Sequence, residues 1–138
     1  MSTTSTMTKT QLLIGGEWRD ASDGGVYEDV NPATGAKIAG VADATRDDVD
    51  AAVAAARRSF DAGRWSSMAA SRRGKIVYKI AQLIGERAAD IALLEVRDNG
   101  KALATAKGEL GASVDCFEFY AGAATKNYGE TLPPPLPT

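Results

Sequence analysis

The sequence predicts an α/β fold in which a small antiparallel β-hairpin unit is followed by amphipathic helices. In the first third of the chain, short strand-like runs are separated by turns that contain glycine. Beyond Thr45, apolar residues recur at spacings of three and four, which is the period of a helix. At 138 residues, the chain is long enough for one domain.

The β unit is expected to begin with a hairpin whose turn is formed by Gly15 and Gly16, because both central positions of such a turn require positive φ. A second turn is expected over residues 22–25. The Asn-Pro-Ala-Thr-Gly sequence of residues 31–35 predicts a reverse turn, in which proline presets φ and glycine closes the turn. Four strands follow from these turns, over residues 12–14, 17–19, 26–30 and about 37–42.

The first helix carries its own start and stop signals. Thr45 followed by Asp48 is a close relative of the capping box, and negative charge in the first turn suits the helix dipole. Gly63 is expected to stop this helix. One apolar stripe runs along it, formed by Val49, Val53, Ala56 and Phe60.

Three further helices are expected over about residues 68–85, 86–97 and 102–128. Asn99 and Gly100 end the second of them, because both residues tolerate the left-handed conformation found at helix termini. Apolar side chains are expected to face inward in all three: Ile76, Ile80, Leu83 and Ile84; then Ile91, Leu93 and Leu94; then Leu110, Val114, Phe117, Ala121, Ala124 and Tyr128.

Composition excludes several classes of protein. The net charge of −2 gives no bias toward nucleic acid. Residues 1–11 contain no apolar core of the signal-peptide type, and no apolar run approaches a membrane span, so we expect a cytoplasmic chain with a flexible arm over residues 1–11. Because the chain has no histidine and one cysteine, it cannot by itself hold a Ser-His-Asp triad, a Cys-His pair or a histidine-ligated metal.

No group of residues in the chain is predicted to perform chemistry unaided. The glycines lack the spacing of nucleotide-binding loops. Cys116 lies beside Asp115, whose carboxylate opposes thiolate formation, so a structural role is favoured. Asp115 and Glu118 at i and i+3 are more typical of a solvated helix face than of an acid/base pair. A basic stretch lacks the interleaved aromatic residues of a nucleic-acid platform: Arg72, Arg73, Lys75 and Lys79.

Several strings, in this order and spacing, resemble the opening of the NAD(P)-dependent aldehyde dehydrogenase superfamily, in the branch that includes betaine-aldehyde and aliphatic-aldehyde enzymes. The resemblance covers nearly all of residues 12–133. The strings are LIGGEW (residues 13–18), VNPATG (30–35), DVDAAVAAAR (48–57), DNGK (98–101) and FYAG (119–122).

The resemblance implies a parent enzyme that oxidises an aldehyde to a carboxylic acid with NAD or NADP, through a cysteine thioester that a glutamate-activated water hydrolyses. In the family, the cysteine, the glutamate and the cofactor loop all follow the matched segment. Cys116 does not match the motif of the nucleophile. We therefore expect no catalytic and no cofactor-binding residue in this chain, which alone should be inactive.

The resemblance also implies a domain organisation. Residues 12–131 correspond to the N-terminal part of the cofactor-binding domain. The proline-rich residues 132–138 correspond to the start of a strand of the oligomerisation region in a homo-oligomer, truncated at Thr138.

The resemblance also implies a metal site. Some relatives hold a monovalent cation through positions that match Val30 and Asp98, and this site would be incomplete here. An equally open interpretation is that Asp98 is a helix-terminal residue whose side chain hydrogen-bonds the local backbone.

A non-enzymatic alternative stays open. The segment would then be an interaction or oligomerisation module derived from that enzyme, which binds partners through unpaired strand edges and apolar faces. A nucleic-acid-binding helical domain is disfavoured by the charge. Neither the aldehyde, the choice between NAD and NADP, nor the oligomer size follows from the sequence.

Overall fold

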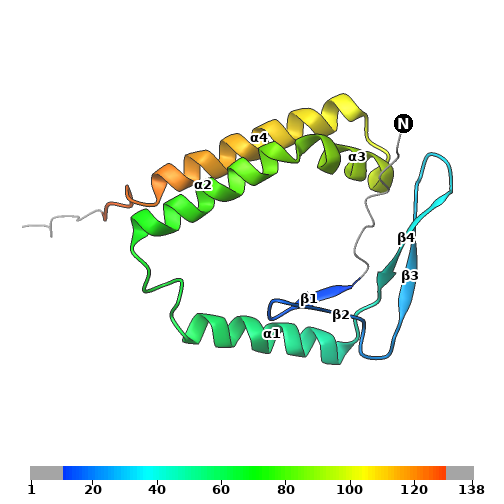
Figure 1. Cartoon of the computed structure of the whole chain (residues 1–138), viewed down its shortest axis with the longest axis horizontal. Helices are drawn as coiled ribbons and strands as arrows, with labels where there is room; N and C mark the ends of the chain where they lie inside the picture. The colour runs from blue at the N-terminus through cyan, green and yellow to red at the C-terminus, as the bar shows by residue number, and fades with distance from the viewer. Residues whose placement is uncertain (1–10, 130–138) are drawn as a thin grey trace, which may run out of the picture.

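The computed structural model describes residues 11–129. Figure 1 shows two strand pairs followed by helices, in agreement with the predicted α/β class. The predicted arm (residues 1–11), apart from Gln11, and the predicted oligomerisation strand (residues 132–138) lie outside the described residues. The elements are β1 (Leu12–Ile14), β2 (Glu17–Arg19), β3 (Val26–Val30), β4 (Lys37–Ala42), α1 (Arg46–Asp61), α2 (Ala70–Glu86), α3 (Ala88–Asn99) and α4 (Leu103–Ala123).

The strands form two separate antiparallel pairs, β1 with β2 and β3 with β4. The turn between β1 and β2 is confirmed as predicted, because Gly15 and Gly16 have φ values of 65° and 92°. The β3–β4 register shifts between Asp29 and Val30, at the end of β3. All four predicted strand ranges are confirmed, which shows that turn chemistry sets the boundaries of this β unit.

The junction between the β unit and α1 is held by Asp48, a buried carboxylate that is 5% exposed. The capping box is confirmed: the Thr45 hydroxyl accepts from the Asp48 amide at 3.3 Å, and Asp48 Oδ2 accepts from the Thr45 amide at 3.0 Å. The same oxygen accepts from the Ser22 amide at 3.0 Å, so it also fixes the loop that precedes β3. No local sequence pattern predicts the Ser22 contact, which joins positions 26 residues apart.

These donors hold the pKa of the Asp48 carboxyl below its usual value, the Ser22 amide contributing most and the Thr45 amide next. A carboxyl whose pKa is lower in the folded state stabilises the fold above its ordinary pKa, and this stability is lost as the pH falls through the folded-state pKa.

We expect Asp48→Asn to lower the free energy of unfolding at neutral pH and to flatten its decline in acid, as measured by urea unfolding at a series of pH values. Asp47→Asn, at an exposed position in the same turn, should keep the wild-type profile. Equal acid slopes for all three proteins would contradict the role given to Asp48.

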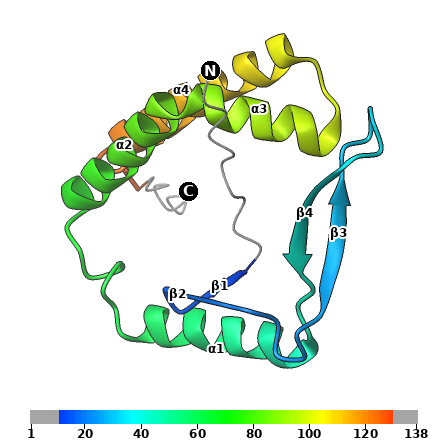
Figure 2. The ribbon, with the colours of Figure 1, turned by 45° about the vertical axis from the view of Figure 1, so that its right-hand side comes forward.

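Helices α2 and α4 lie side by side, and α3 packs against α4 (Figure 2). On the other side of the molecule, α1 lies beside β1 and β2. Besides Ile14, Ala21, Ala42 and Ala81, which are buried elsewhere, the buried hydrophobic residues form a small core cluster of Ala92, Ala106 and Leu110. Partly buried residues surround it: Ile84, Ala88, Ile91 and Val96. Within residues 11–129, no helix combines the length and the apolar character needed to cross a membrane.

The expectation that Ile76, Ile80 and Leu83 face inward is wrong for this chain, since these side chains are 38%, 40% and 40% exposed. Helix α2 instead turns Gly74 and Ala81 inward, and both are buried. A Cβ atom on Gly74 would lie 2.6 Å from the carbonyl oxygen of Ala121, so small residues let the two backbones approach closely. The bulky stripe of α2 therefore remains exposed.

The predicted inward faces of the last two helices are also only partly confirmed. Ile91 and Leu110 belong to the core, but Leu93 and Leu94 are exposed. Helix α4 ends at Ala123, not at Tyr128, which is 81% exposed. The helical period continues to Tyr128, but Thr125 and Asn127 are weak helix formers, and Lys126 closes a turn onto Ala123 instead.

Candidate functional site

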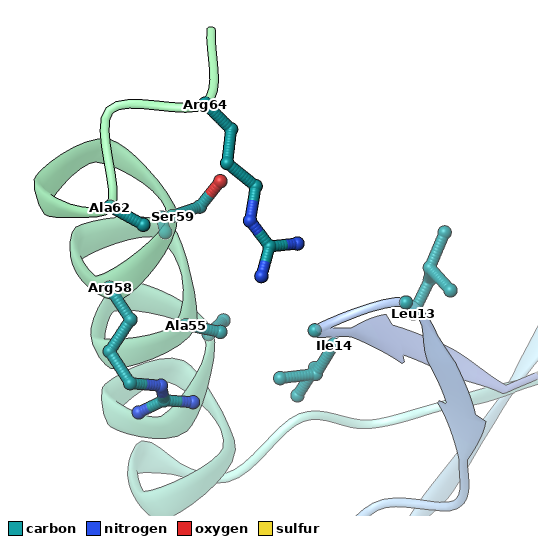
Figure 3. Close-up of a pocket in the computed structure, with 11 residues that line it drawn as sticks. Leu13, Ile14, Ala55, Arg58, Ser59, Ala62 and Arg64 are labelled. Atoms are coloured by element: carbon teal, nitrogen blue, oxygen red, sulfur yellow. The ribbon is translucent and has the colours of Figure 1, made fainter.

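The larger of two hollows described here lies between the β1–β2 turn and the C-terminal half of α1, with a volume of about 710 Å³. Figure 3 shows Arg58 and Ser59 on α1, Arg64 reaching down from the segment that follows the helix, and Ile14 of the hairpin facing Ala55 across the hollow. Small and apolar residues form the rest of the lining: Leu13, Ile14, Gly15, Gly16, Ala52, Ala55, Ala56 and Ala62.

This hollow contains donors but no group that can act as a nucleophile or a general base at neutral pH. The guanidinium groups of Arg58 and Arg64 are hydrogen-bond donors with no acceptor atom, and the Ser59 hydroxyl has no base among the lining residues. Arg58 also lies in the last turn of α1, where the helix dipole favours positive charge. The arrangement is suited to binding negative charge and not to catalysis.

The second hollow, of about 530 Å³, lies where the start of α2 meets the end of α4. Trp65 and Tyr120 supply its aromatic surface. Arg73 also lines it, but its guanidinium donates to the carbonyl oxygens of Ser66 and Met68, so it holds the segment before α2 in place. This hollow also lacks a nucleophile paired with a base.

The reactive candidates considered in the sequence lie on exposed positions of α4. Cys116, Asp115 and Glu118 are all exposed, so Cys116 does not pack in the core. Among residues 11–129, no group of three or more histidine, cysteine or carboxylate side chains is arranged to hold a metal ion. This part of the chain therefore contains no recognisable catalytic centre.

The segments that carry Val30 and Asp98 meet at one corner of the structure. The turn that follows β3 reaches the end of α3 (Figure 2), where a Cβ atom on Gly100 would lie 2.9 Å from Cγ of Pro32. Asp98 is exposed, and its carboxylate makes no hydrogen bond or ion pair with any described residue. The local backbone bond at this helix end is made instead by Asn99, whose Oδ1 accepts from the Lys101 amide at 2.9 Å.

Lys101 in the same corner links the end of α3 to α4 by ion pairs with Glu95 and Glu109. The hydrogen bond to Glu109 and then that to Glu95 raise the pKa of the Lys101 ammonium above its usual value. No sequence pattern predicts this three-residue cluster, because its spacings of six and eight residues span a turn and match no helical period.

We expect Gly100→Ala to destabilise the chain by about 1–2 kcal/mol, because Gly100 has φ of 78° and any Cβ would meet Pro32. Gly24→Ala is the matched control: Gly24 has φ of 74° but open space around it. Urea unfolding should show a larger loss at Gly100 than at Gly24. Equal losses would mean that the Pro32 contact contributes nothing.

The comparisons with known proteins identify the class. A model of the aldehyde dehydrogenase family matches residues 18–137. The chain is 42% identical over 126 residues to betaine aldehyde dehydrogenase of Bacillus subtilis, covering 91% of this chain and 26% of that protein. It is 40% identical over 124 residues to human mitochondrial 10-formyltetrahydrofolate dehydrogenase, covering 89% of this chain and 13% of that protein.

Solved structures agree. A Bacillus cereus aldehyde dehydrogenase in its NAD+ complex superposes with a TM-score of 0.85 at 38% identity, covering 94% of this chain and 26% of that chain. A Staphylococcus aureus betaine aldehyde dehydrogenase in complex with NAD+ gives a TM-score of 0.87 at 34% identity, with the same coverage.

The fold is the N-terminal part of an oxidoreductase fold of the α/β class. The chain belongs to the aldehyde dehydrogenase family. It spans about a quarter of the length of the aldehyde dehydrogenases described above.

Proposed function

We propose that this chain is the N-terminal segment of an enzyme that oxidises an aldehyde to a carboxylic acid with NAD+ or NADP+ through a cysteine thioester. The observation that carries the proposal is the family match over residues 18–137, together with the resemblance to dehydrogenases solved with NAD+. In this proposal, residues 12–131 belong to the cofactor-binding domain, and residues 132–138 begin a strand of the oligomerisation region in a cytoplasmic homo-oligomer.

The described residues act in this proposal as scaffold. The β1–β2 hairpin, the Asp48 junction and the α2–α4 pair fix the shape of the segment. None of them supplies the thiolate, the general base or the oxyanion donors that aldehyde oxidation requires. Those groups would come from the part of the enzyme that lies beyond the matched quarter.

The isolated chain should therefore reduce no cofactor. It would be incubated with NAD+ or NADP+ and a panel containing betaine aldehyde and aliphatic aldehydes, and reduced nicotinamide would be followed by absorbance. We expect no signal above a blank without protein. Aldehyde-dependent reduction of the cofactor would overturn the proposal that this segment is incompetent alone.

The second candidate is an interaction module that functions without the rest of the enzyme. The observation that favours it is the number of large apolar side chains exposed on α1, α2 and α3. Size-exclusion chromatography at a series of protein concentrations discriminates between the two. A chain that stays monodisperse as the concentration rises favours the module, whereas self-association through the exposed apolar faces favours a segment of a larger fold.

We further propose that Val30, through its backbone carbonyl, and Asp98 contribute to a monovalent-cation site in the whole enzyme. The unpaired carboxylate of Asp98 and the close approach of Pro32 to Gly100 support this proposal. In a whole enzyme that carries this segment, potassium chloride should raise the thermal midpoint more than tetramethylammonium chloride at equal ionic strength. Asp98→Asn should reduce this difference, and Asp90→Asn, at an exposed position of α3, should not. An unchanged difference in Asp98→Asn would refute the site.

A further inference from the structure

One side of α2 carries a continuous stripe of exposed residues. We call it the α2 outer stripe and define it as Arg72, Ile76, Ile80, Leu83 and Arg87. Their spacings of four, four, three and four place them on one side of the helix, Arg87 being the residue directly after α2. At 1.5 Å per residue, the stripe is about 22 Å long.

The composition of this stripe differs from that of the side that packs on α4. The side that faces α4 is lined by Gly74 and Ala81, which are buried. Gly74 lies close to Ala121, so this side packs directly on α4. The outer stripe holds three branched aliphatic side chains that are each about two-fifths exposed. Contiguous apolar surface rimmed by polar residues marks an interaction site in soluble proteins.

The ends of the stripe are positively charged. Arg72 and Arg87 make no ion pair or hydrogen bond through their side chains with any residue between 11 and 129. Lys79, beside the stripe, is already engaged by Glu86 and Gln82. A partner surface that fits is therefore an apolar groove with carboxylates, or the negative end of a helix, near each end.

In solved relatives, the part that matches this chain belongs to a much longer chain. In the B. cereus and S. aureus enzymes, the arrangement of this chain recurs over 94% of its length, inside chains of which it is only 26%. We propose that the α2 outer stripe is the surface through which this segment docks on the remaining three-quarters of an aldehyde dehydrogenase subunit. This inference rests on the proposed function and adds a specific face and the chemistry of its partner surface.

The exposed stripe of α1 is less suited to the same role. Val49, Val53 and Phe60 are exposed there, but the guanidinium of Arg57 lies over the Phe60 ring, 4.5 Å from its centroid. Arg57 also pairs with Asp61, so one end of this stripe is covered by a charged pair from α1 itself. The α2 outer stripe has no such cover.

The experiment uses a chimera in which this chain replaces the matching segment of B. subtilis betaine aldehyde dehydrogenase. Ile80→Cys and Gln82→Cys are each made in a Cys116→Ser background, and the rate of maleimide labelling of each introduced thiol is measured by peptide mass spectrometry. Gln82 lies on α2 two residues from Ile80, is exposed and points away from the stripe. We expect Ile80→Cys to label at least about tenfold more slowly in the chimera than in the isolated chain, and Gln82→Cys to label at similar rates in both.

Equal labelling of Ile80→Cys in the chimera and in the isolated chain would overturn the docking surface, whether or not the chimera is active. Activity is measured separately, so an active chimera with an unprotected stripe would leave the proposed function standing and remove this inference. A protected stripe in an inactive chimera would support the docking surface and count against the proposed function.

The charged ends are tested by paired substitutions in the same chimera. Arg72→Ala combined with Arg87→Ala should lower its thermal midpoint more than Lys75→Ala combined with Lys107→Ala. Lys75 and Lys107 are exposed and lie off the stripe. Equal shifts would overturn the acidic character assigned to the partner surface.

Discussion

Leu110→Ala should lower the free energy of unfolding of the chain by about 3 kcal/mol, because it removes the largest side chain of the buried core. Leu110 is 9% exposed and packs with Ala92 and Ala106, which are fully buried and too small to fill the space left behind. Ile84 and Ile91, which pack against this cluster, would lose contacts as well. Since this cluster joins α3 to α4, the loss should appear first as detachment of α3.

Urea unfolding, followed by circular dichroism at the helical band, measures this effect. Leu103→Ala is the matched control, because Leu103 lies in the same helix but is 37% exposed. We expect the control to cost less than about 1 kcal/mol. Equal losses at the two leucines would mean that the core cluster does not stabilise the chain.

Gly74→Ala should destabilise the chain by about 1–3 kcal/mol, although alanine is the better helix former by about 1 kcal/mol. The new Cβ would lie 2.6 Å from the Ala121 carbonyl oxygen and 3.4 Å from Cβ of Ala124. The first of these neighbours is backbone, so α2 and α4 must move apart. The close approach of the two helices is therefore what makes glycine necessary here.

Gly111→Ala separates this contact from helix propensity. Gly111 lies inside α4, and a Cβ there would meet nothing within 4 Å. We expect this variant to stabilise the chain by about 0.5–1 kcal/mol, the opposite sign to Gly74→Ala. If both glycine substitutions stabilised the chain, the α2–α4 packing described here would be wrong.

Local chemistry was sufficient to predict much of this fold. The turn at Gly15 and Gly16, the capping box at Thr45 and the helix stop at Gly100 all depend on residues close in sequence, and all three are confirmed. The choice of buried face in α2 depends instead on the shape of α4. A helical period identifies an apolar stripe, but it does not reveal that Gly74 offers a closer approach than Ile76 or Ile80.

The candidate sites also divide into features that the sequence indicates and features that arise only from tertiary contacts. The family, which the match over residues 18–137 confirms, was accessible from the order and spacing of the sequence strings. The Ser22–Asp48 contact and the Lys101 cluster were not, since each joins residues whose proximity arises only after folding. Val30 and Asp98 remain a proposed cation site whose ligands are only partly present in this segment.

The most direct test of the central claim, that this chain is the scaffold segment of an aldehyde dehydrogenase, is the activity of the chimera with B. subtilis betaine aldehyde dehydrogenase. We expect aldehyde-dependent reduction of nicotinamide by the chimera and none by the isolated chain under the same conditions. A folded, oligomeric chimera without activity, or an isolated chain that reduces the cofactor by itself, would contradict it.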